Sequence, residues 1–426
     1  MVDAPVEGPA SFPLAEHPRL GAIEVFPSQD RRRRSLVLRD PADPNVKPIM
    51  VSEGAGAVLA LLDGQRTLQE VSSALLLRGG TITPGQLRSF LTQLDEAGFL
   101  EGPRAEYRFQ QRQATFLAQP LRPAIHAGGA YSNAPADLSR MIEGAYGHAD
   151  GPGSTPAQPE PGAKPLRAAI APHVDLHRGA PTYSWAYKAL AEAQPAEVYV
   201  VLGTCHAGVR GDFAATRKAY DTPLGAVPAD AEFLDRLGRN WGHDLFAGEF
   251  SHAGEHSIEF QAVYLRSLGL AGHGAASIVP ILCESLHSMV PDGTSPRDVA
   301  AVSQFLAALR QTLAEDGRRT SLIAAVDLAH IGPRFGDQWR VDVARQTMVG
   351  VADREMLDLV LEPDADAYYA HVIRDRDTRR ICGLTPIYLL TALMQAEQRR
   401  GELLRYTQWV DVDKSSSVTF ASAIFR

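Results

Sequence analysis

Histidines occur next to the predicted ends of strands, or at the start of a predicted helix, at four separate places in this chain. The four motifs are Ala-Pro-His173-Val-Asp175-Leu-His177-Arg178, Leu-Gly-Thr-Cys205-His206, Gly-Glu255-His256-Ser-Ile-Glu259 and Asp327-Leu-Ala-His330. Open α/β sheets place their binding crevices at the ends of strands, so these side chains are candidates for one shared site. A further candidate, Cys382, lies in Ile-Cys-Gly-Leu-Thr-Pro-Ile, at the start of a late predicted helix.

Imidazole and thiolate groups that converge in this way suit a borderline-soft metal ion. Three protein ligands leave coordination positions for water, dioxygen or a substrate. The spacing matches no compact motif such as His-Glu-x-x-His, and any single histidine of this kind is more often a hydrogen-bonded core or loop residue. The chain has neither a Gly-x-Ser-x-Gly elbow nor a Gly-x-x-x-x-Gly-Lys loop, which disfavours a serine hydrolase and a phosphate-loop enzyme.

The elements that must position these residues alternate between strands and helices from residue 166 onward. Apolar runs predict strands at 166–171, 198–202, 213–216, 276–282 and 321–326, and two alternating runs predict strands at 403–412 and 417–425. Helices are predicted at 183–193, 258–268, 296–315, 338–361 and 386–399. This alternation indicates a layered α/β fold.

Composition places the chain among soluble globular proteins. Its 426 residues, of which 45% are hydrophobic and 22% charged, indicate two or three domains with room for a core. A net charge of −8 disfavours nucleic acid as a partner, and no apolar run approaches the roughly 18 residues that a membrane span needs. Three cysteines and an N-terminus without a secretory signal favour a reducing compartment, so we expect a cytoplasmic protein.

The first 115 residues carry a different pattern. Residues 1–34 are rich in Pro and acidic groups, include four consecutive arginines at 31–34, and predict a flexible segment. Residues 35–115 predict short helices, one of them opened by the capping box Thr67-Leu-Gln-Glu70, and a strand beginning at Gly98. This arrangement is typical of a winged-helix-like module. The stretches 61–68 and 94–100 resemble the peptide-binding PqqD family, and both peptide capture at a strand edge and a purely structural role stay open.

The rest of the chain resembles the Memo family, which includes the bacterial AmmeMemoRadiSam system protein B. The matching pieces, in chain order, are His126-Ala-Gly-Gly-Ala-Tyr131, Ala171-Pro-His173, Leu202-Gly-Thr-Cys-His206, Thr222-Pro-Leu-Gly225, Glu255-His-Ser-Ile-Glu259, Asp327-Leu-Ala-His330, Ile381-Cys-Gly383 and Ser416-Ser-Val-Thr-Phe420. The resemblance covers 121–426 and implies the fold of class III extradiol ring-cleaving (LigB-like) dioxygenases, a layered mixed sheet flanked by helices. Residues 151–165 have the Pro and Gly content of an interdomain linker, but the resemblance starts before them and places them in a surface loop of this domain.

The resemblance also implies a mononuclear metal site. It places the ligands at His173, His206 and Cys382, where the thiol replaces a carboxylate of the related dioxygenases. Two histidines and a carboxylate are typical of non-haem Fe(II), and a thiolate shifts the preference toward softer ions. Fe(II) is therefore the favoured ion, and copper and zinc stay open.

The resemblance assigns a catalytic role near the metal to four residues: His330, Asp327, Glu255 and His256. A neutral imidazole suits proton transfer at cellular pH, so the first of them is the expected general acid/base. Three polar residues that depart from the family pattern form a candidate contact for an acidic or peptide substrate: Asp175, His177 and Arg178. A capping network for the following helix explains these three residues equally well.

Three functions remain open from the sequence. The leading hypothesis is a metal-dependent oxidoreductase with a dioxygenase-like reaction on a small-molecule or peptide substrate. The second is a non-catalytic metal-binding adaptor whose first 115 residues recruit a peptide or a radical-enzyme partner, as the family resemblance suggests. The third is a zinc-dependent hydrolase with a metal-bound hydroxide.

Overall fold

The computed structural model describes residues 12–21, 23–28, 35–40, 47–272, 275–413 and 415–426. The chain divides into two compact units, an N-terminal unit, Met1–Gln119, and a C-terminal unit, Pro120–Arg426. The arginine run at 31–34 and much of the predicted flexible segment 1–34 lie outside the described residues. Within the part of the chain that the structure describes, none of the helices has the length and apolar character that crossing a bilayer requires.

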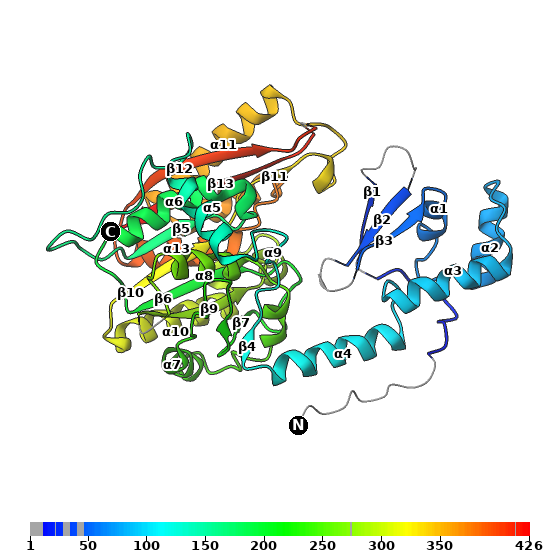
Figure 1. The fold of residues 1–426 in the computed structure, drawn as a ribbon, viewed down its shortest axis with the longest axis horizontal. Coiled ribbons are helices and arrows are strands. Elements are labelled where there is room, and N and C mark those ends of the chain that lie inside the picture. The colour runs from blue at the N-terminus through cyan, green and yellow to red at the C-terminus, as the bar shows by residue number, and fades with distance from the viewer. Residues whose placement is uncertain (1–11, 22, 29–34, 41–46, 273–274, 414) are drawn as a thin grey trace. The chain divides into compact units, whose positions relative to one another are not determined.

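The described residues of the N-terminal unit form a three-stranded antiparallel sheet and four helices (Figure 1). The elements are β1 (Glu24–Pro27), β2 (Ser35–Arg39), β3 (Ile49–Ser52), α1 (Ala55–Leu59), α2 (Leu68–Leu77), α3 (Pro84–Ala97) and α4 (Pro103–Ala118). The predicted capping box of Thr67 and Glu70 is confirmed at the start of α2, and Thr83 with Gln86 forms a second one at α3. Leu38, Val71 and Leu91 lie in the shared core.

Two local predictions in this unit are wrong. The residues after Gly98 form no strand. Leu100 makes one isolated bridge with Leu20, and the chain then enters α4, which Pro103 opens at a position where a missing N–H costs nothing. Glu24–Pro27, inside the predicted flexible segment, form β1 because they pair with β2. The chain after α3 thus continues as a long helix, and the winged-helix assignment stays a prediction.

The C-terminal unit is built on a mixed sheet in the order β11-β13-β5-β10-β6-β9-β7, with β12 paired to β13. Its strands are β5 (Ala168–Ala171), β6 (Val198–Thr204), β7 (Phe213–Ala215), β9 (Ser277–Cys283), β10 (Thr320–Ala325), β11 (His330–Ile331), β12 (Gly401–Val410) and β13 (Ser417–Phe425). The central strands β5, β10, β6 and β9 are parallel, and the outer strands β7 and β13 run antiparallel to them. A separate pair joins β4 (Leu121–Arg122) to β8 (Ala219–Tyr220).

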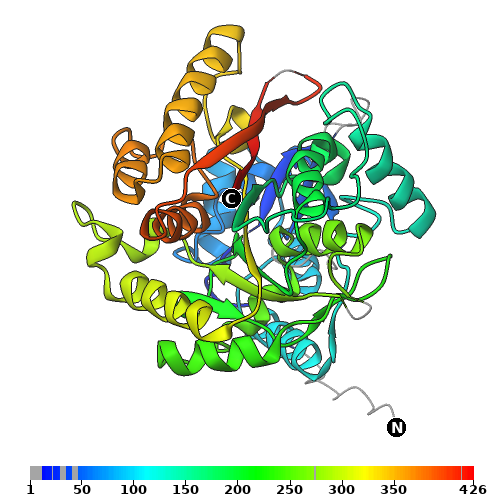
Figure 2. The ribbon, with the colours of Figure 1, turned by 90° about the vertical axis from the view of Figure 1, so that its left-hand side faces the viewer.

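Helices cover both faces of this sheet. Along β6, Val200 and Leu202 point into one apolar cluster while Tyr199 and Val201 point into another, as the alternation of a strand requires. The first cluster includes residues of α7 (Ala231–Trp241), α10 (Ala300–Asp316), α11 (Val343–Leu361), α12 (Ala365–Ile373) and α13 (Leu384–Ala396). The second includes residues of α5 (Pro135–Tyr146), α6 (Leu176–Glu192) and α8 (Ser257–Ser267). The predicted α/β fold, a layered mixed sheet flanked by helices, is confirmed (Figures 1 and 2).

Several boundaries differ from the predicted ones for local reasons. The helix predicted at 183–193 begins at Leu176 and continues through Pro181. Proline is more common in the first turn of a helix than in its interior, so the prediction placed the helix start after Pro181. The helix predicted at 338–361 begins at Val343, because the Asp342 side chain accepts the N–H of Arg345 and caps it there. Short elements complete the unit: α9 (Leu286–Met289) and the 3₁₀ helices Glu249–Ala253, Pro296–Asp298 and Pro333–Phe335.

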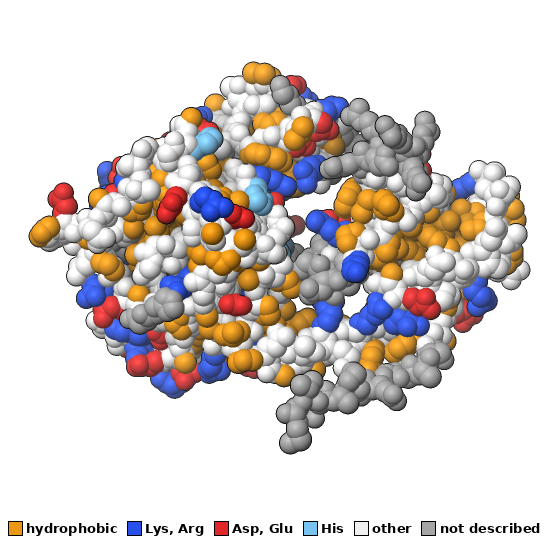
Figure 3. Space-filling model, viewed as in Figure 1, with side chains coloured by type: hydrophobic (Ala, Val, Ile, Leu, Met, Phe, Trp, Pro, Cys, Tyr) orange, Lys and Arg blue, Asp and Glu red, His pale blue; other side chains and the backbone are white. Residues whose placement is uncertain are grey.

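The Pro/Gly-rich residues 151–165 belong to the C-terminal unit and carry no helix or strand. The first half of this segment is tied to α6, where Lys188 Nζ donates to Ser154 Oγ at 3.0 Å and Ala157 N donates to Glu192 Oε1 at 3.0 Å. The boundary between the two units follows α4 instead. On the visible face of the C-terminal unit, acidic and basic side chains are interspersed (Figure 3).

Candidate metal centre

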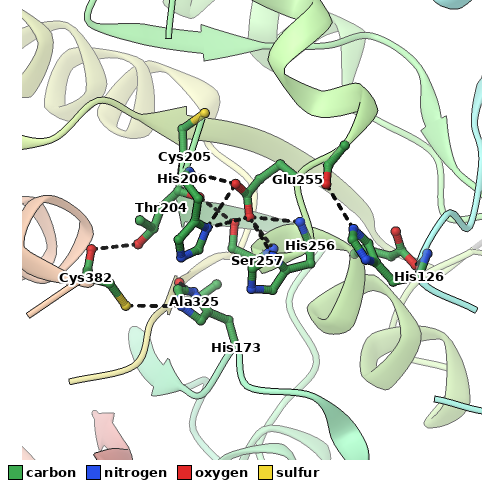
Figure 4. A network of polar contacts seen from close by, with 12 residues as sticks. His126, His173, Thr204, Cys205, His206, Glu255, His256, Ser257, Ala325 and Cys382 are labelled. Atoms are coloured by element: carbon green, nitrogen blue, oxygen red, sulfur yellow. Dashed lines mark hydrogen bonds and ion pairs between the residues drawn. The ribbon is translucent and has the colours of Figure 1, made fainter. Parts of the chain in front are cut away.

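Three histidines from distant parts of the sequence converge at one edge of the sheet. His173 follows β5, His206 follows β6, and His256 immediately precedes α8. One ring nitrogen of each lies within 4.8 Å of the others, a group that offers three ligand atoms to a metal ion (Figure 4). His173 is buried, whereas His206 exposes 39% of its side chain. The cluster is therefore built into the fold and reachable from solvent.

The orientation of His173 is fixed from two sides. Its Nδ1 lies 3.0 Å from the carbonyl oxygen of Ala325, at the end of β10. A carbonyl only accepts, so Nδ1 carries the proton and Nε2 keeps its lone pair. The backbone N–H of His173 donates to Asp327 Oδ1 at 3.0 Å, which holds the loop after β5 against the loop after β10.

The side chain of His206 is oriented by Glu255. The Nδ1 atom lies 3.1 Å from both carboxylate oxygens, and the backbone N–H of His206 donates to Glu255 Oε2 at 2.8 Å. The Nδ1 proton therefore points to Glu255, and Nε2 is the atom left for a ligand. Glu255 also accepts the N–H of His256 at 2.8 Å, so one carboxylate contacts both loops.

The ring of His256 packs against the other two imidazoles. It stacks on His206 with ring centroids 4.7 Å apart and planes 18° apart, and meets His173 edge-on at 5.2 Å. Its Nδ1 is 3.3 Å from Glu255 Oε1. The sequence suggests a catalytic position for His256, and the structure places it where it can act as a third nitrogen ligand.

The thiol of Cys382 reaches the same cluster just before α13. Its Sγ lies 3.2 Å from His173 Nε2 and 3.6 Å from the carbonyl oxygen of Asp327 (Figure 4). Thr204, at the end of β6, donates from Oγ1 to the Cys382 carbonyl at 3.1 Å. A Cβ on Gly383 would lie 2.5 Å from the Val326 Cβ, so only glycine lets this segment approach β10 so closely.

The segment that precedes Cys382 has an unusual backbone. Arg376, Asp377 and Arg380 adopt φ values of 58°, 48° and 54°, in the left-handed region that non-glycine residues rarely occupy. Side chains stabilise these conformations: Asp377 Oδ1 accepts the N–H of Ile381 at 2.9 Å, and Arg380 Nη2 pairs with Asp337 at 2.7 Å. Such local strain persists only where surrounding contacts fix the chain.

The comparisons with known proteins agree with this architecture. The family model of Memo-like proteins matches residues 122–424. This chain belongs to the Memo family. A MEMO1 family protein of Methanopyrus kandleri is 30% identical to it over 311 residues, which cover 71% of this chain and 98% of the relative. The family resemblance expected from the sequence is confirmed.

A second relative extends the similarity to the N-terminal unit. A MEMO1 family protein of Aquifex aeolicus is 24% identical over 410 residues, which cover 96% of this chain and 99% of the relative. A MEMO1 family protein of Thermus thermophilus is 25% identical over 358 residues, covering 83% of this chain and 97% of its own. Some Memo family proteins thus match nearly the whole of this chain, whereas others match it without most of its N-terminal part.

Burial and neighbouring charges shift the pKa values of the groups in this Memo family centre. Burial lowers the pKa of His173 to about 3, and burial also holds the pKa of His256 well below its usual value. For His206 burial acts downward too, but the charge of Glu255 outweighs it and raises the pKa well above the usual value. Burial raises the pKa of the Cys382 thiol. His206 and Cys382 therefore each hold a proton that a metal ion must displace.

Two predicted catalytic residues, Asp327 and His330, lie near His173. Asp327 is buried, its Oδ2 is 3.8 Å from His173 Nε2, and burial raises its pKa to about 6. His330, on β11, is 3.1 Å from the carbonyl of Leu328 through Nδ1, and its ring meets Phe335 edge-on at 5.0 Å. Burial lowers the pKa of His330, partly offset by the charge of Asp327, so the two groups lie within electrostatic range.

The predicted substrate residues lie at the beginning of α6. Asp175 precedes the helix and pairs with Arg178 at 3.3 Å, and the Arg178 guanidinium stacks on Trp409 at 4.6 Å. His177 and Arg178 line a cavity of 370 Å³ whose other walls come from α5, the following loop and β12. The three imidazoles of the cluster are not among the residues that line this cavity.

A buried network behind the cluster escaped the sequence analysis. Arg122, which is fully buried, pairs with Glu259, donates to the His252 carbonyl at 2.9 Å and to the Glu255 carbonyl at 2.5 Å. The hydroxyl of Tyr131 also donates to Glu259. Tyr131 and Glu259 end two of the motifs that resemble the Memo family, and this was the available signal. Arg122, four positions before the first motif, gave none.

Proposed function

We propose that this protein is a metal-dependent oxidoreductase that binds one metal ion between His173, His206 and Cys382. The observation that carries the proposal is the convergence of the three side chains. His173 Nε2 carries no proton of its own and lies 3.2 Å from Cys382 Sγ, and the ring centroids of His173 and His206 are 5.0 Å apart. Two neutral nitrogens and a thiolate form a donor set that suits iron, copper or zinc.

Fe(II) is the ion we favour, because such a site supplies open coordination positions for dioxygen and for a small-molecule or peptide substrate. The chain contributes orientation and proton transfer. Hydrogen bonds of His173 and His206 fix both rings before the ion arrives. His330 donates from Nδ1 to Leu328, which leaves Nε2 able to take a proton from the substrate and return it. Asp327, with a pKa near 6, stabilises the charged form of His330.

Anaerobic purification, metal analysis and oxygen-uptake measurements test this proposal. We expect about one iron per chain and oxygen uptake that depends on it, with both lost in His206→Ala. A His243→Ala variant is a matched control, since this exposed histidine packs near Trp241, with ring centroids 5.2 Å apart, and does not line the cavity of His177 and Arg178. Wild-type protein without affinity for any of the three metals would refute the proposal.

A zinc-dependent hydrolase is the second candidate, and His256 is the observation in its favour. Three histidines whose ring nitrogens lie within 4.8 Å of one another form a donor set that zinc enzymes use with a bound hydroxide. This function predicts that purified protein retains zinc, takes up no oxygen and loses metal when His256 is replaced by Gln. Iron-dependent oxygen uptake would exclude it.

A further inference from the structure

Glu255 makes an unusual number of contacts around the metal centre. Its carboxylate is 3% exposed. Oε2 accepts the N–H of His206 at 2.8 Å, and Oε1 accepts the N–H groups of His256 and Ser257 at 2.8 and 2.9 Å. The ring Nδ1 of His206 lies 3.1 Å from both oxygens. One carboxylate therefore connects the loop after β6 to the first turn of α8 (Figure 4).

These contacts argue against proton transfer by Glu255 itself. A general base needs a lone pair within reach of the proton that it removes. Each carboxylate oxygen of Glu255 already accepts at least one backbone N–H, and the Nδ1 proton of His206 lies between the two. The side chain is also shielded from solvent. The arrangement is that of a group which holds other residues in place.

We propose that Glu255 is a positioning residue for the metal ligand His206: it keeps a proton on Nδ1 and leaves Nε2 as the atom that faces the metal. The inference rests on the proposed metal function and adds the group that orients one ligand. A carboxylate that accepts the second ring N–H of a metal-bound histidine fixes its tautomer and makes the imidazole a stronger donor.

The protein holds Glu255 in place independently of His206. The backbone carbonyl of Glu255 accepts from Arg122 Nη2 at 2.5 Å, and Arg122 is buried and paired with Glu259. The hydroxyl of Ser257 donates to the carbonyl of Thr204 at 2.9 Å, which ties the start of α8 to the end of β6. These contacts fix the backbone at Glu255, and the N–H groups of His256 and Ser257 hold its carboxylate, so it is His206 that adjusts to Glu255.

Glu255→Gln is the most informative variant. The amide keeps the size of the carboxylate but turns one oxygen into an NH₂ donor. With the NH₂ at the Oε2 position, it faces the N–H of His206; at the Oε1 position, it faces the N–H groups of His256 and Ser257. Neither orientation satisfies all of these donors, so the variant weakens the hydrogen bonds that orient the His206 ring.

Glu284→Gln provides a matched control. Glu284 is also a partly buried carboxylate beside this loop, where it accepts the N–H of Val209 at 2.5 Å and of Ser285 at 2.9 Å. In the described part of the chain, the Glu284 carboxylate accepts from these N–H groups and from the Ser288 hydroxyl, and forms no hydrogen bond with an imidazole. A change seen in Glu255→Gln and absent in Glu284→Gln therefore reports the contact with His206 rather than the loss of a loop contact.

Imidazole nitrogen NMR of the metal-free, full-length protein is the first test. At a pH above the titration of His206, we expect Nδ1 of the wild type to keep its proton, and Glu255→Gln to move a large share of it to Nε2. Glu284→Gln should leave the His206 signals unchanged. A wild-type His206 whose neutral ring is protonated on Nε2 would overturn the proposal whatever the variants do.

Zinc titration of the same proteins is the second test. We expect Glu255→Gln to bind Zn²⁺ about 10- to 100-fold more weakly than the wild type, the range found when such supporting groups are removed. In the double variant with His206→Ala, Glu255→Gln should add no more than about a threefold loss, because the two changes act on one interaction. Fully additive losses would contradict the proposal. A wild type that binds no Zn²⁺ would count against the metal function, and the NMR result would still decide the role of Glu255.

Discussion

The thiol of Cys382 lies 3.2 Å from Nε2 of His173, although the two residues are 209 positions apart in the chain. His173 follows β5, and Cys382 lies in the turn before α13, where Gly383 packs against the end of β10. Strands β5 and β10 are parallel neighbours in the sheet. Their carboxyl ends therefore bring a nitrogen and a sulfur donor together at the place where open α/β sheets form binding sites.

Replacement of Cys382 by Ser should remove the sulfur ligand. We expect Co²⁺-loaded wild type to show a thiolate charge-transfer absorption that Cys382→Ser lacks. The variant should also bind the ion more than about 100-fold more weakly, since it loses a donor rather than a supporting group. Cys205→Ser is the control, because the Cys205 thiol is buried and donates to the Gly208 carbonyl at 3.2 Å. Wild type without the band would point to His256 as the third ligand.

Metal affinity should rise with pH. The pKa of His206 is raised by Glu255 and that of Cys382 by burial, so both groups carry a proton that the ion must displace. Below both pKa values we expect the release of about two protons for each ion bound. Calorimetry in buffers of different ionisation enthalpy measures this number, and Cys382→Ser should reduce it by about one. Affinity that is independent of pH would contradict the assigned protonation states.

His252 should make the protein less stable in acid. Its ring is buried between Tyr220 Oη, at 2.7 Å from Nδ1, and the Ala214 carbonyl, at 3.1 Å from Nε2. Burial lowers its pKa to about 3, while the unfolded chain titrates near 6.5. The unfolded state therefore binds a proton that the native state does not, and the free energy of unfolding falls as pH drops through this range, by up to about 1.4 kcal/mol per pH unit.

Urea denaturation between about pH 7 and about pH 4 measures this contribution of His252. The variant His252→Gln should lose stability at neutral pH, because the hydrogen bonds of the ring are no longer matched. Its free energy of unfolding should depend less steeply on pH than that of the wild type. Equal slopes in the two proteins would show that His252 has the same pKa in the native and unfolded states, which contradicts the prediction.

Gly383→Ala should displace Cys382 from the metal centre. A Cβ at this position would lie 2.5 Å from the Val326 Cβ and 2.8 Å from the Asp327 carbonyl, neither of which can move freely. We expect a loss of about 1–3 kcal/mol in the free energy of unfolding and weaker metal binding. Gly144→Ala is the control, because Gly144 lies in α5 with nothing within 4 Å of its Cβ position. This change should raise the free energy of unfolding by about 0.5–1 kcal/mol. Normal metal affinity in Gly383→Ala would contradict the prediction.

A helix whose start carries a strong local signal could be predicted from the sequence. Another helix, α7, was missed although its apolar residues have helical spacing. Thr67 and Glu70 form their capping box through contacts between near neighbours, so four residues of sequence suffice to predict it. The unpredicted helix α7 buries Phe233, Leu237 and Trp241, which share one face at helical spacing. In α4 only Phe116 is buried, so its apolar pattern is weak and its start depends on Pro103.

The sequence by itself determined the α/β class, the Memo family and the residue types that offer nitrogen and sulfur to a metal. Apolar alternation, capping signals and short motifs are local, so they can be recognised without coordinates. Only the tertiary structure decided which donors meet: it added His256 to His173 and His206, and it placed Cys382 against His173. It also gave His177 and Arg178 a cavity that the three clustered histidines do not line. The physical reason is that strand order and loop packing set the distances between side chains, and these depend on contacts across the whole domain.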